Sequence, residues 1–335
     1  MAHACRFNKL NTSLLYVSSN GIFPKDDDGV LFENNDIACF PDRLGSADGY
    51  GLSKWTADSI VSAAHKYLIL PTITIRYGNL GWHSNMGVGN PLDYQGMMLS
   101  GCRRLGVFPK ATKGWILEVT PVDFASYALA TLASNSKLLQ DGSIFHYVQD
   151  GWKKSDHVYR WMCDTDGCSY RTVSSNEWKK IIEEQVADSN CDASVLSDMI
   201  GLMALVSGFD DNASYLSTQS LLDCTKLDSA LDQNSSGRNN LSRKGLINEA
   251  YYTKFFGATF DKVFDRKLTV TLPSINDQSP KSTEAIKADP SVPTSESSSP
   301  TGPLAGKVAV VTGASSGIGR AIVVSLVQAR CHVGK

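Results

Sequence analysis

The chain has 335 residues, 42% of them apolar, a formal net charge of −2 and eight cysteines. Its length allows two domains and its apolar fraction supports a hydrophobic core, while the near-zero charge argues against nucleic-acid or anionic-membrane partners. Cysteine usage favours a reducing compartment, and the apolar runs are too short for a signal peptide or a membrane span. We therefore expect a cytoplasmic protein. Cys163 and Cys168 lack a matching pair at zinc-ligand spacing, so no metal site is expected.

The first informative stretch is residues 14–19, an apolar and aromatic run that predicts a short buried strand ending in Ser18 and Ser19. Open α/β sheets place their chemistry at the carboxyl ends of the strands. Residues 49–66 then predict a helix on which Tyr50 and Lys54, four residues apart, share a face. We therefore expect Ser19, Tyr50 and Lys54 to converge on one substrate oxygen.

These residue types suit the reduction of a carbonyl group by hydride transfer. Such a reaction leaves negative charge on the oxygen, so a proton donor must be in place. A free tyrosine has a pKa of about 10, and lowering it by about three units takes roughly 4 kcal/mol, which a nearby lysine ammonium helps to supply. Tyr-x-x-x-Lys alone is a weak signal, because about one match is expected by chance in such a chain. The alternative is an aromatic core residue beside a solvated lysine.

Further along the chain, the β-branched run at residues 72–77 predicts a second buried strand. Gly78 and Asn79 follow at its carboxyl end, where the backbone can approach a nicotinamide closely; an ordinary turn is the alternative. Two aspartates near helix starts are interpreted as structural. Asp93 is expected to cap the helix that begins near residue 94, and Asp123 to favour the dipole of the helix after residue 121.

A resemblance to a known family rests on five blocks: Tyr16-Val-Ser-Ser-Asn-Gly-Ile-Phe23, Gly49-Tyr-Gly-Leu-Ser-Lys-Trp55, Arg76-Tyr-Gly-Asn-Leu-Gly81, Gly89-Asn-Pro-Leu-Asp-Tyr94 and Thr120-Pro-Val-Asp-Phe124. Their order and spacing resemble those of thioester reductase domains, which are extended short-chain dehydrogenase/reductases. Such domains end nonribosomal peptide synthetases, aminoadipate reductases and carboxylic acid reductases. The resemblance covers residues 1–260.

The resemblance implies reduction by NADPH of an acyl thioester carried on the phosphopantetheine arm of an acyl carrier (thiolation) domain, with release of an aldehyde. It assigns carbonyl binding to Ser19 and proton donation to Tyr50. It assigns Lys54 to the ribose hydroxyls of the cofactor and to the pKa of Tyr50. Tyr50, Lys54, Gly78 and Asn79 are thus the expected cofactor contacts of this part of the chain.

The expected fold is α/β, and it divides the chain into successive segments. Residues 1–150 are interpreted as the C-terminal half of a Rossmann-like core with a partial parallel sheet, because no Gly-rich turn precedes Ser19. The first half that the resembled family possesses is missing, so we interpret the sequence as a fragment and expect it to be inactive alone. Residues 151–272 predict a helical lid over the substrate, anchored by Trp161, Trp178, Tyr251 and Phe255. Residues 273–303, rich in Ser and Pro, predict a flexible linker.

Residues 304–335 carry a second signal, the run Lys307-Val-Ala-Val-Val-Thr-Gly-Ala-Ser-Ser-Gly-Ile-Gly-Arg320 followed by a helical stretch. Strand, Gly-rich turn and helix in this order predict a dinucleotide loop, and the block resembles the opening of the compact short-chain dehydrogenases. The cofactor-binding residues expected here are Gly313, Ser315, Ser316, Gly317, Ile318 and Gly319. So short a piece cannot bury a core of its own, and we interpret it as the isolated start of a second Rossmann domain.

Several alternatives stay open at this point. The favoured layout is two consecutive reductases, as in the glycine betaine reductases, which carry an acid to an aldehyde and then to an alcohol. In the other layout, the terminal strand, loop and helix dock into the gap in the first sheet, as in a circular permutation. For function, the alternatives are an extended dehydrogenase or epimerase acting on a free small substrate, and a non-catalytic gene fragment that holds NADPH poorly.

Overall fold

The computed structural model describes residues 12–23, 30–33, 37, 49–90, 93–110, 116–151, 153–187, 221–234, 245–260, 302–314 and 317–334. The largest sheet in these ranges is parallel and has the strand order β1 (Leu14–Ser19), β3 (Thr72–Tyr77), β8 (Ser143–Tyr147). In its register Ser19 lies opposite Tyr77, so β1 and β3 end side by side. The predicted α/β fold with a partial parallel sheet is confirmed.

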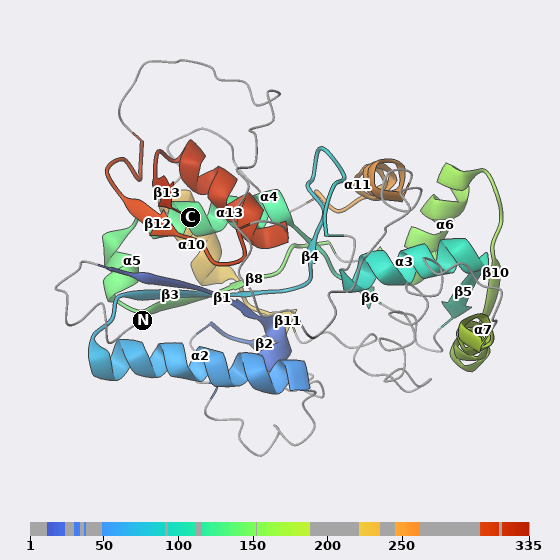
Figure 1. Ribbon diagram of the computed structural model, residues 1–335, viewed down its shortest axis with the longest axis horizontal. Helices are drawn as coiled ribbons and strands as arrows, with labels where there is room; N and C mark the ends of the chain where they lie inside the picture. Colours follow the sequence, from blue (N-terminus) through green and yellow to red (C-terminus); the bar gives the residue numbers. More distant parts are fainter. Residues whose placement is uncertain are drawn as a thin grey trace, which may run out of the picture.

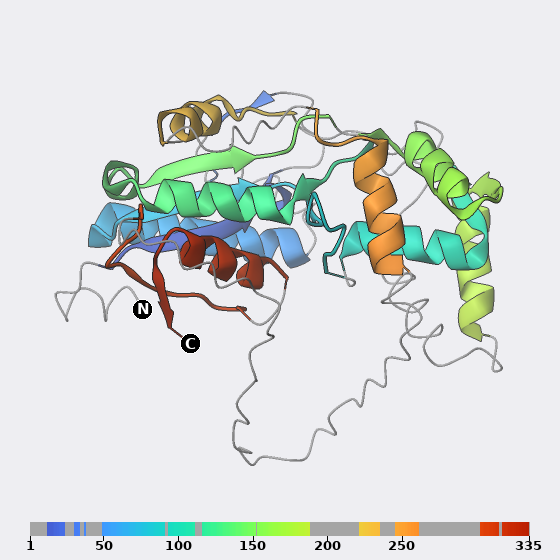
Figure 2. The ribbon, with the colours of Figure 1, turned by 90° about the horizontal axis from the view of Figure 1, so that it is seen from above.

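Helices cover both faces of this sheet (Figures 1 and 2). Helix α2 (Gly49–Leu68) lies on one face, and α4 (Val122–Ala133) lies on the other with α10 (Thr225–Asn234) and the short α5 (Ser136–Gln140). The middle strand β3 is buried at every residue. A parallel strand with both faces covered is expected to be rich in apolar and β-branched residues, and its sequence Thr-Ile-Thr-Ile-Arg-Tyr fits this apart from Arg76.

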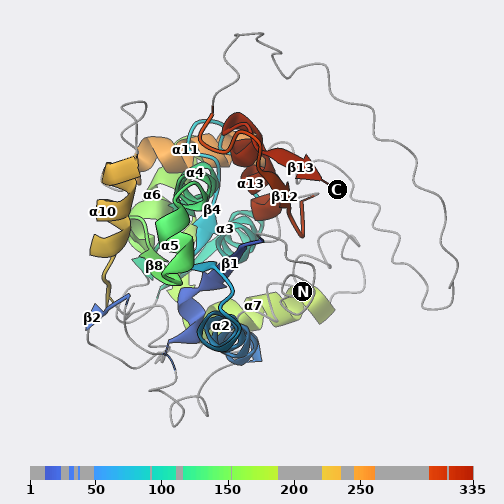
Figure 3. The same ribbon diagram turned by 90° about the vertical axis from the view of Figure 1, so that its left-hand side faces the viewer.

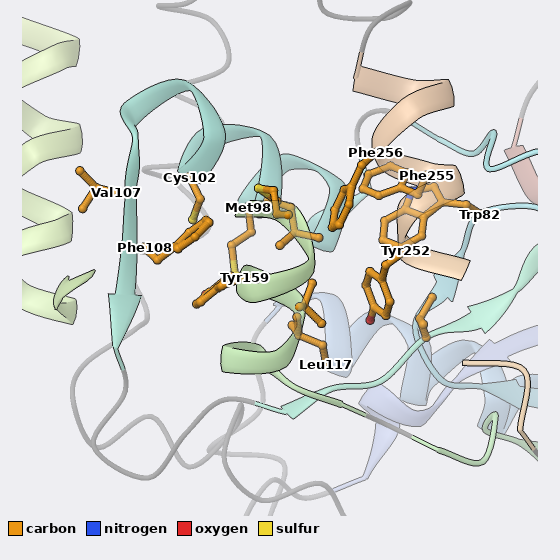
Figure 4. Close-up of a cluster of buried hydrophobic side chains, with 14 of the residues drawn as sticks. Trp82, Met98, Cys102, Val107, Phe108, Leu117, Tyr159, Tyr252, Phe255 and Phe256 are labelled. Atoms are coloured by element: carbon orange, nitrogen blue, oxygen red, sulfur yellow. The ribbon is translucent and has the colours of Figure 1, made fainter. Parts of the chain in front are cut away.

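A second body of helices packs around its own apolar cluster (Figure 4). It contains α3 (Tyr94–Leu105), α6 (Ser155–Asp166), α7 (Ser175–Ala187) and α11 (Glu249–Phe255), with the paired parallel strands β5 (Val107–Lys110) and β10 (Arg171–Ser174). The rings of Trp82 and Phe255 stack with centroids 3.4 Å apart. Of the four predicted anchors, Trp178, Tyr251 and Phe255 are buried, and Trp161 packs against the cluster from its rim.

The packing does not follow the predicted boundary at residue 150. Helix α3 and strand β5 precede that boundary but pack with α6 and α7, whereas α10 follows it but packs on α4 and β8. The chain therefore crosses between the two bodies more than once. Helix α3 supplies buried Met98, Leu99 and Cys102 to the second cluster, which is the physical reason for its placement.

Short elements complete the described part of the chain. They are the helical turns η1 (Asn20–Ile22) and η4 (Phe256–Phe260), and the paired strands β4 (Leu80–Gly81) with β7 (Thr120–Pro121), β6 (Ile116–Leu117) with β9 (Lys153–Lys154), and β2 (Val30–Leu31) with β11 (Leu221–Leu222). No helix in the described ranges has the length and apolar character needed to cross a bilayer. Likewise, the described residues contain no cluster of three or more His, Cys, Asp or Glu arranged for a metal ion.

The C-terminal residues form the predicted strand, turn and helix. Strands β12 (Val308–Val310) and β13 (His332–Gly334) pair in parallel, with α13 (Gly317–Gln328) between them in sequence. This unit is not isolated, contrary to the prediction, because its apolar side chains join the cluster around α4. In the described residues β12 pairs with β13 and not with β1, so the unit packs beside the central sheet without extending its hydrogen-bonded ladder. Most of the predicted linker, residues 273–301, lies outside the described residues.

Candidate active site

Ser19 and Tyr50 meet at the carboxyl end of β1. Ser19 is the N-cap of η1, and its Oγ accepts a hydrogen bond from the Gly21 amide at 3.1 Å. A β-carbon built on Gly21 would lie 3.4 Å from Ser19 Oγ and 3.3 Å from Cε1 of Tyr50. The side chains of Ser19 and Tyr50 therefore flank the same small residue, while their convergence on one substrate oxygen stays a prediction.

Lys54 lies one helical turn beyond Tyr50 on α2. Its Nζ is 5.9 Å from the centroid of the Tyr50 ring. Tyr50 is 57% exposed and Lys54 is half-buried, so the Tyr50 phenol remains open to a ligand. The alternative of an aromatic core residue beside a solvated lysine is wrong for Tyr50, because its ring contributes little to either core. A solvated phenol, a cation and a serine hydroxyl thus share the end of one strand.

A buried polar network beneath these residues was not predicted. Ser18 Oγ donates to Asp58 Oδ2 at 2.6 Å, and Arg76 donates to both oxygens of Asp58, from Nε at 3.2 Å and from Nη2 at 3.1 Å. All three residues are at most 3% exposed. The network joins α2 to β1 and β3, and so fixes the helix that carries Tyr50 against the strand that carries Ser19. Its sequence signal was a charged residue within the apolar β3 run.

Gly78 and Asn79 lie at the end of β3, next to the end of β1. The side-chain position of Gly78 is filled by another residue, since a β-carbon there would lie 2.4 Å from Oε2 of Glu118. Glu118 is fully buried, and its carboxylate accepts hydrogen bonds from the Asn79 amide at 2.7 Å and from the Thr120 hydroxyl at 3.2 Å. A side chain at position 78 would have to displace the Glu118 carboxylate from these hydrogen bonds, while contact of Gly78 with a nicotinamide stays a prediction.

Glu118 was also missed by the sequence interpretation, although a glutamate between Leu117 and Val119 is unusual for a buried strand. Burial raises its pKa from 4.5 to about 7, with the hydrogen bonds from Asn79 and Thr120 opposing the rise. Between those two values the folded chain holds a proton that the unfolded chain has lost. Stability from this group is therefore present at low pH and falls as the pH rises through that window, by about 3 kcal/mol in all.

We expect the substitution Glu118→Gln to remove this pH dependence. The free energy of unfolding is measured in urea at about pH 4 and about pH 8. Between these two pH values, that of the variant should rise by about 3 kcal/mol relative to that of the unsubstituted chain. Burial also raises the pKa of Glu33 to about 6 and lowers that of His146 to about 3. Both groups titrate in the variant and in the unsubstituted chain, so their contributions cancel when the two are compared. The exposed Glu183→Gln on α7 is the matched control and should follow the unsubstituted chain. If the stability of Glu118→Gln changed with pH in the same way as that of the unsubstituted chain, Glu118 would not be the source of the pH dependence.

The segment after Asn79 is held by helix α11. The hydroxyl of Tyr251 accepts from the Trp82 amide and donates to the Trp82 carbonyl, both at 3.0 Å. Lys254 Nζ donates to the Ser84 carbonyl at 3.2 Å. Helix α11 therefore contacts the chain a few residues after Gly78 and Asn79, the predicted cofactor contacts. A movement of α11 would displace this segment.

Two aspartates near this segment have the structural roles that were predicted. Asp93 caps α3, accepting from the Gly96 amide at 3.0 Å. Asp123 lies in the first turn of α4, where its oxygens accept from the amide and the hydroxyl of Ser84 at 2.9 and 2.6 Å. Neither carboxylate is needed to explain the chemistry.

The C-terminal glycine turn has the geometry of a tight strand-to-helix connection. Gly313 has a φ of +70°, and a β-carbon on Gly319 would lie 2.1 Å from the Gly313 carbonyl oxygen. Both positions therefore require glycine. Gly317 and Ile318 begin α13, whereas Ser315 and Ser316 lie outside the described residues. The contact of these residues with a cofactor stays a prediction.

Comparison with known proteins finds a matching family model and solved structures of similar architecture. Residues 1–129 match the family model NAD_binding_4, described as Male sterility protein. The N-terminal part of the chain is thus similar to this family. Solved structures with the same fold include the terminal R domain from the myxalamid PKS-NRPS biosynthetic pathway, with a TM-score of 0.62 and 23% identity over 76% of this chain and 59% of that one. The reductase domain of a nonribosomal peptide synthetase from Mycobacterium tuberculosis aligns with a TM-score of 0.57 and 18% identity over 73% and 59% of the two chains.

Curated relatives are reductases and synthetases much longer than this chain. The glycine betaine reductase of Emericella nidulans is 27% identical over 327 residues, which is 95% of this chain and 22% of the relative. The large subunit of the L-2-aminoadipate reductase of Eremothecium gossypii is 28% identical over 181 residues, or 54% and 13% of the two chains. The chain thus spans less than a quarter of each. The predicted likeness to nonribosomal-peptide-synthetase-type and aminoadipate reductases is confirmed.

Proposed function

We propose that this chain is part of a thioester reductase that uses NADPH to release a carrier-bound acyl group as an aldehyde. The observation that carries the proposal is the meeting of Ser19 and Tyr50 at Gly21, with Lys54 one turn beyond. A hydroxyl that binds a carbonyl oxygen, an acid and a nearby cation are what hydride reduction of that carbonyl requires. The relatives that act on carboxylic acids support the substrate class.

In the proposed mechanism, Ser19 donates a hydrogen bond to the thioester carbonyl oxygen and orients it toward Tyr50. When bound, the reduced nicotinamide supplies the hydride to the carbonyl carbon. Tyr50 gives its proton to the oxygen, which forms a hemithioacetal. Cleavage of the carbon–sulfur bond then leaves the aldehyde and releases the carrier thiol, whose sulfur takes up the hydroxyl proton. Lys54, whose ammonium favours the phenolate left on Tyr50, would also hold the ribose hydroxyls of the cofactor. Asn79 and Gly78 would line the nicotinamide edge.

The partners in this proposal are an acyl carrier domain with its phosphopantetheine arm and a second reductase. The alignment with the glycine betaine reductase runs through the C-terminal glycine turn, which supports the tandem layout and a second step from aldehyde to alcohol. A cytoplasmic location and the preference for NADPH over NADH belong to the same proposal.

A comparison of substrates tests the proposal. We expect a protein that carries this chain in its natural context to oxidise NADPH with an acyl group on its carrier domain, and to ignore free ketones and sugar nucleotides. Product analysis should give the aldehyde. Equal turnover of a free sugar nucleotide would favour the epimerase-like alternative.

A further inference from the structure

Helix α13 lies against α4 in both side views of the molecule (Figures 1 and 3). Ile322 and Leu326 of α13 are 8% and 7% exposed and belong to the same apolar cluster as Ala125, Ala128 and Leu129 of α4. The hydroxyl of Ser325 donates to that of Ser126 at 2.9 Å. The contact therefore includes both apolar burial and a specific polar pair.

The strands of the C-terminal unit extend this contact. Ala309 and Val311, on and just after β12, and Val333 of β13 pack against the same cluster. Leu15 and Val17 of the edge strand β1 do so as well. The opposite side of β12 is open, since Val308 and Val310 are 74% and 66% exposed. One face of the unit thus packs against the apolar cluster around α4, and the other face is exposed.

Helix α4 needs such a cover. Its sequence Val-Asp-Phe-Ala-Ser-Tyr-Ala-Leu-Ala-Thr-Leu-Ala is apolar on nearly every side, and a helix of this kind is stable only when it is buried all round. The sheet covers one side, where the Tyr77 hydroxyl donates to the Ala125 carbonyl at 2.8 Å. Helix α13 covers another.

From these observations we propose that residues 302–334 dock on α4, and that α13 and α4 stabilise each other through this interface. The docked partner is a strand–glycine turn–helix unit of the dinucleotide-binding type, held by its helix. The proposal concerns how the two reductase parts are joined and is independent of the catalytic roles of Ser19, Tyr50 and Lys54.

Hydrogen exchange on the full chain tests the interface. In Leu326→Asp we expect amide exchange at least about tenfold faster in both α13 and α4, because each loses its cover. The matched control is Val327→Asp, one residue along the same helix and 53% exposed, which should exchange as the unsubstituted chain does. Helix α7, buried in the separate cluster, should stay protected in both variants.

Two outcomes would overturn the proposal. In the first, Leu326→Asp leaves the exchange of α13 unchanged. In the second, α13 exchanges faster while α4 keeps its protection, so that α4 does not depend on the unit. If amide exchange in α7 also becomes faster in Leu326→Asp, the milder variant Leu326→Ala is measured instead. We expect faster exchange in both α13 and α4 of that variant as well.

Discussion

Replacing Tyr50 with phenylalanine should lower the rate of thioester reduction by about two to four orders of magnitude, the usual contribution of a general acid. The ring would stay beside Ser19 and Gly21, and only the proton donor would be lost. The substitution is best made in a protein that carries this chain in its natural context. Turnover is followed by oxidation of NADPH, and cofactor binding by titration of the same preparation, where we expect little change.

The same helix offers a matched control for this experiment. Tyr67, also on α2, is 69% exposed and lies at the opposite end of the helix from Tyr50. Tyr67→Phe should leave both the rate and the cofactor affinity as they were. If Tyr50→Phe turned over as fast as Tyr67→Phe, the phenol of Tyr50 would have no part in the reaction and the mechanism proposed above would fail.

The candidate site could be predicted from sequence where it depends on local spacing. A strand that ends in serine and a helix with tyrosine and lysine four apart each follow from a few neighbouring residues. The structure adds that the two meet at Gly21. The residues that were missed, Asp58, Arg76 and Glu118, act through contacts between segments 18 to 40 positions apart. Periodicity carries no information about such pairs.

The division into bodies was also beyond local patterns. The sequence of α3 predicts a helix but does not indicate whether that helix packs on the sheet or beside α6. Its place depends on the side chains of the assembled core. The C-terminal unit shows the same limit. Its glycine spacing predicted a strand, a turn and a helix, which the structure confirms. It could not show that Leu326 would be buried with Leu129 of α4.

The second large effect is expected from Asp58→Asn. This change leaves the Arg76 guanidinium buried, 1% exposed, without its counter-charge. Breaking a buried ion pair on one side typically costs about 3–5 kcal/mol, because an uncompensated charge remains in the interior. We expect the free energy of unfolding, measured in urea, to fall by that amount. The reduction rate should fall as well, since α2 is no longer fixed to β1.

A double-mutant cycle separates the pair from its surroundings. Replacing both partners, as in Asp58→Leu with Arg76→Leu, removes the charges together and should be less destabilising than Asp58→Asn alone. The exposed pair of Lys180 and Glu184, 3.9 Å apart on α7, supplies the control, because Glu184→Gln should change stability by less than about 1 kcal/mol. A loss in Asp58→Asn no larger than in Glu184→Gln would show that the network does not hold α2 in place. Ser19 and Tyr50 would then owe their proximity to the apolar packing of the helix alone.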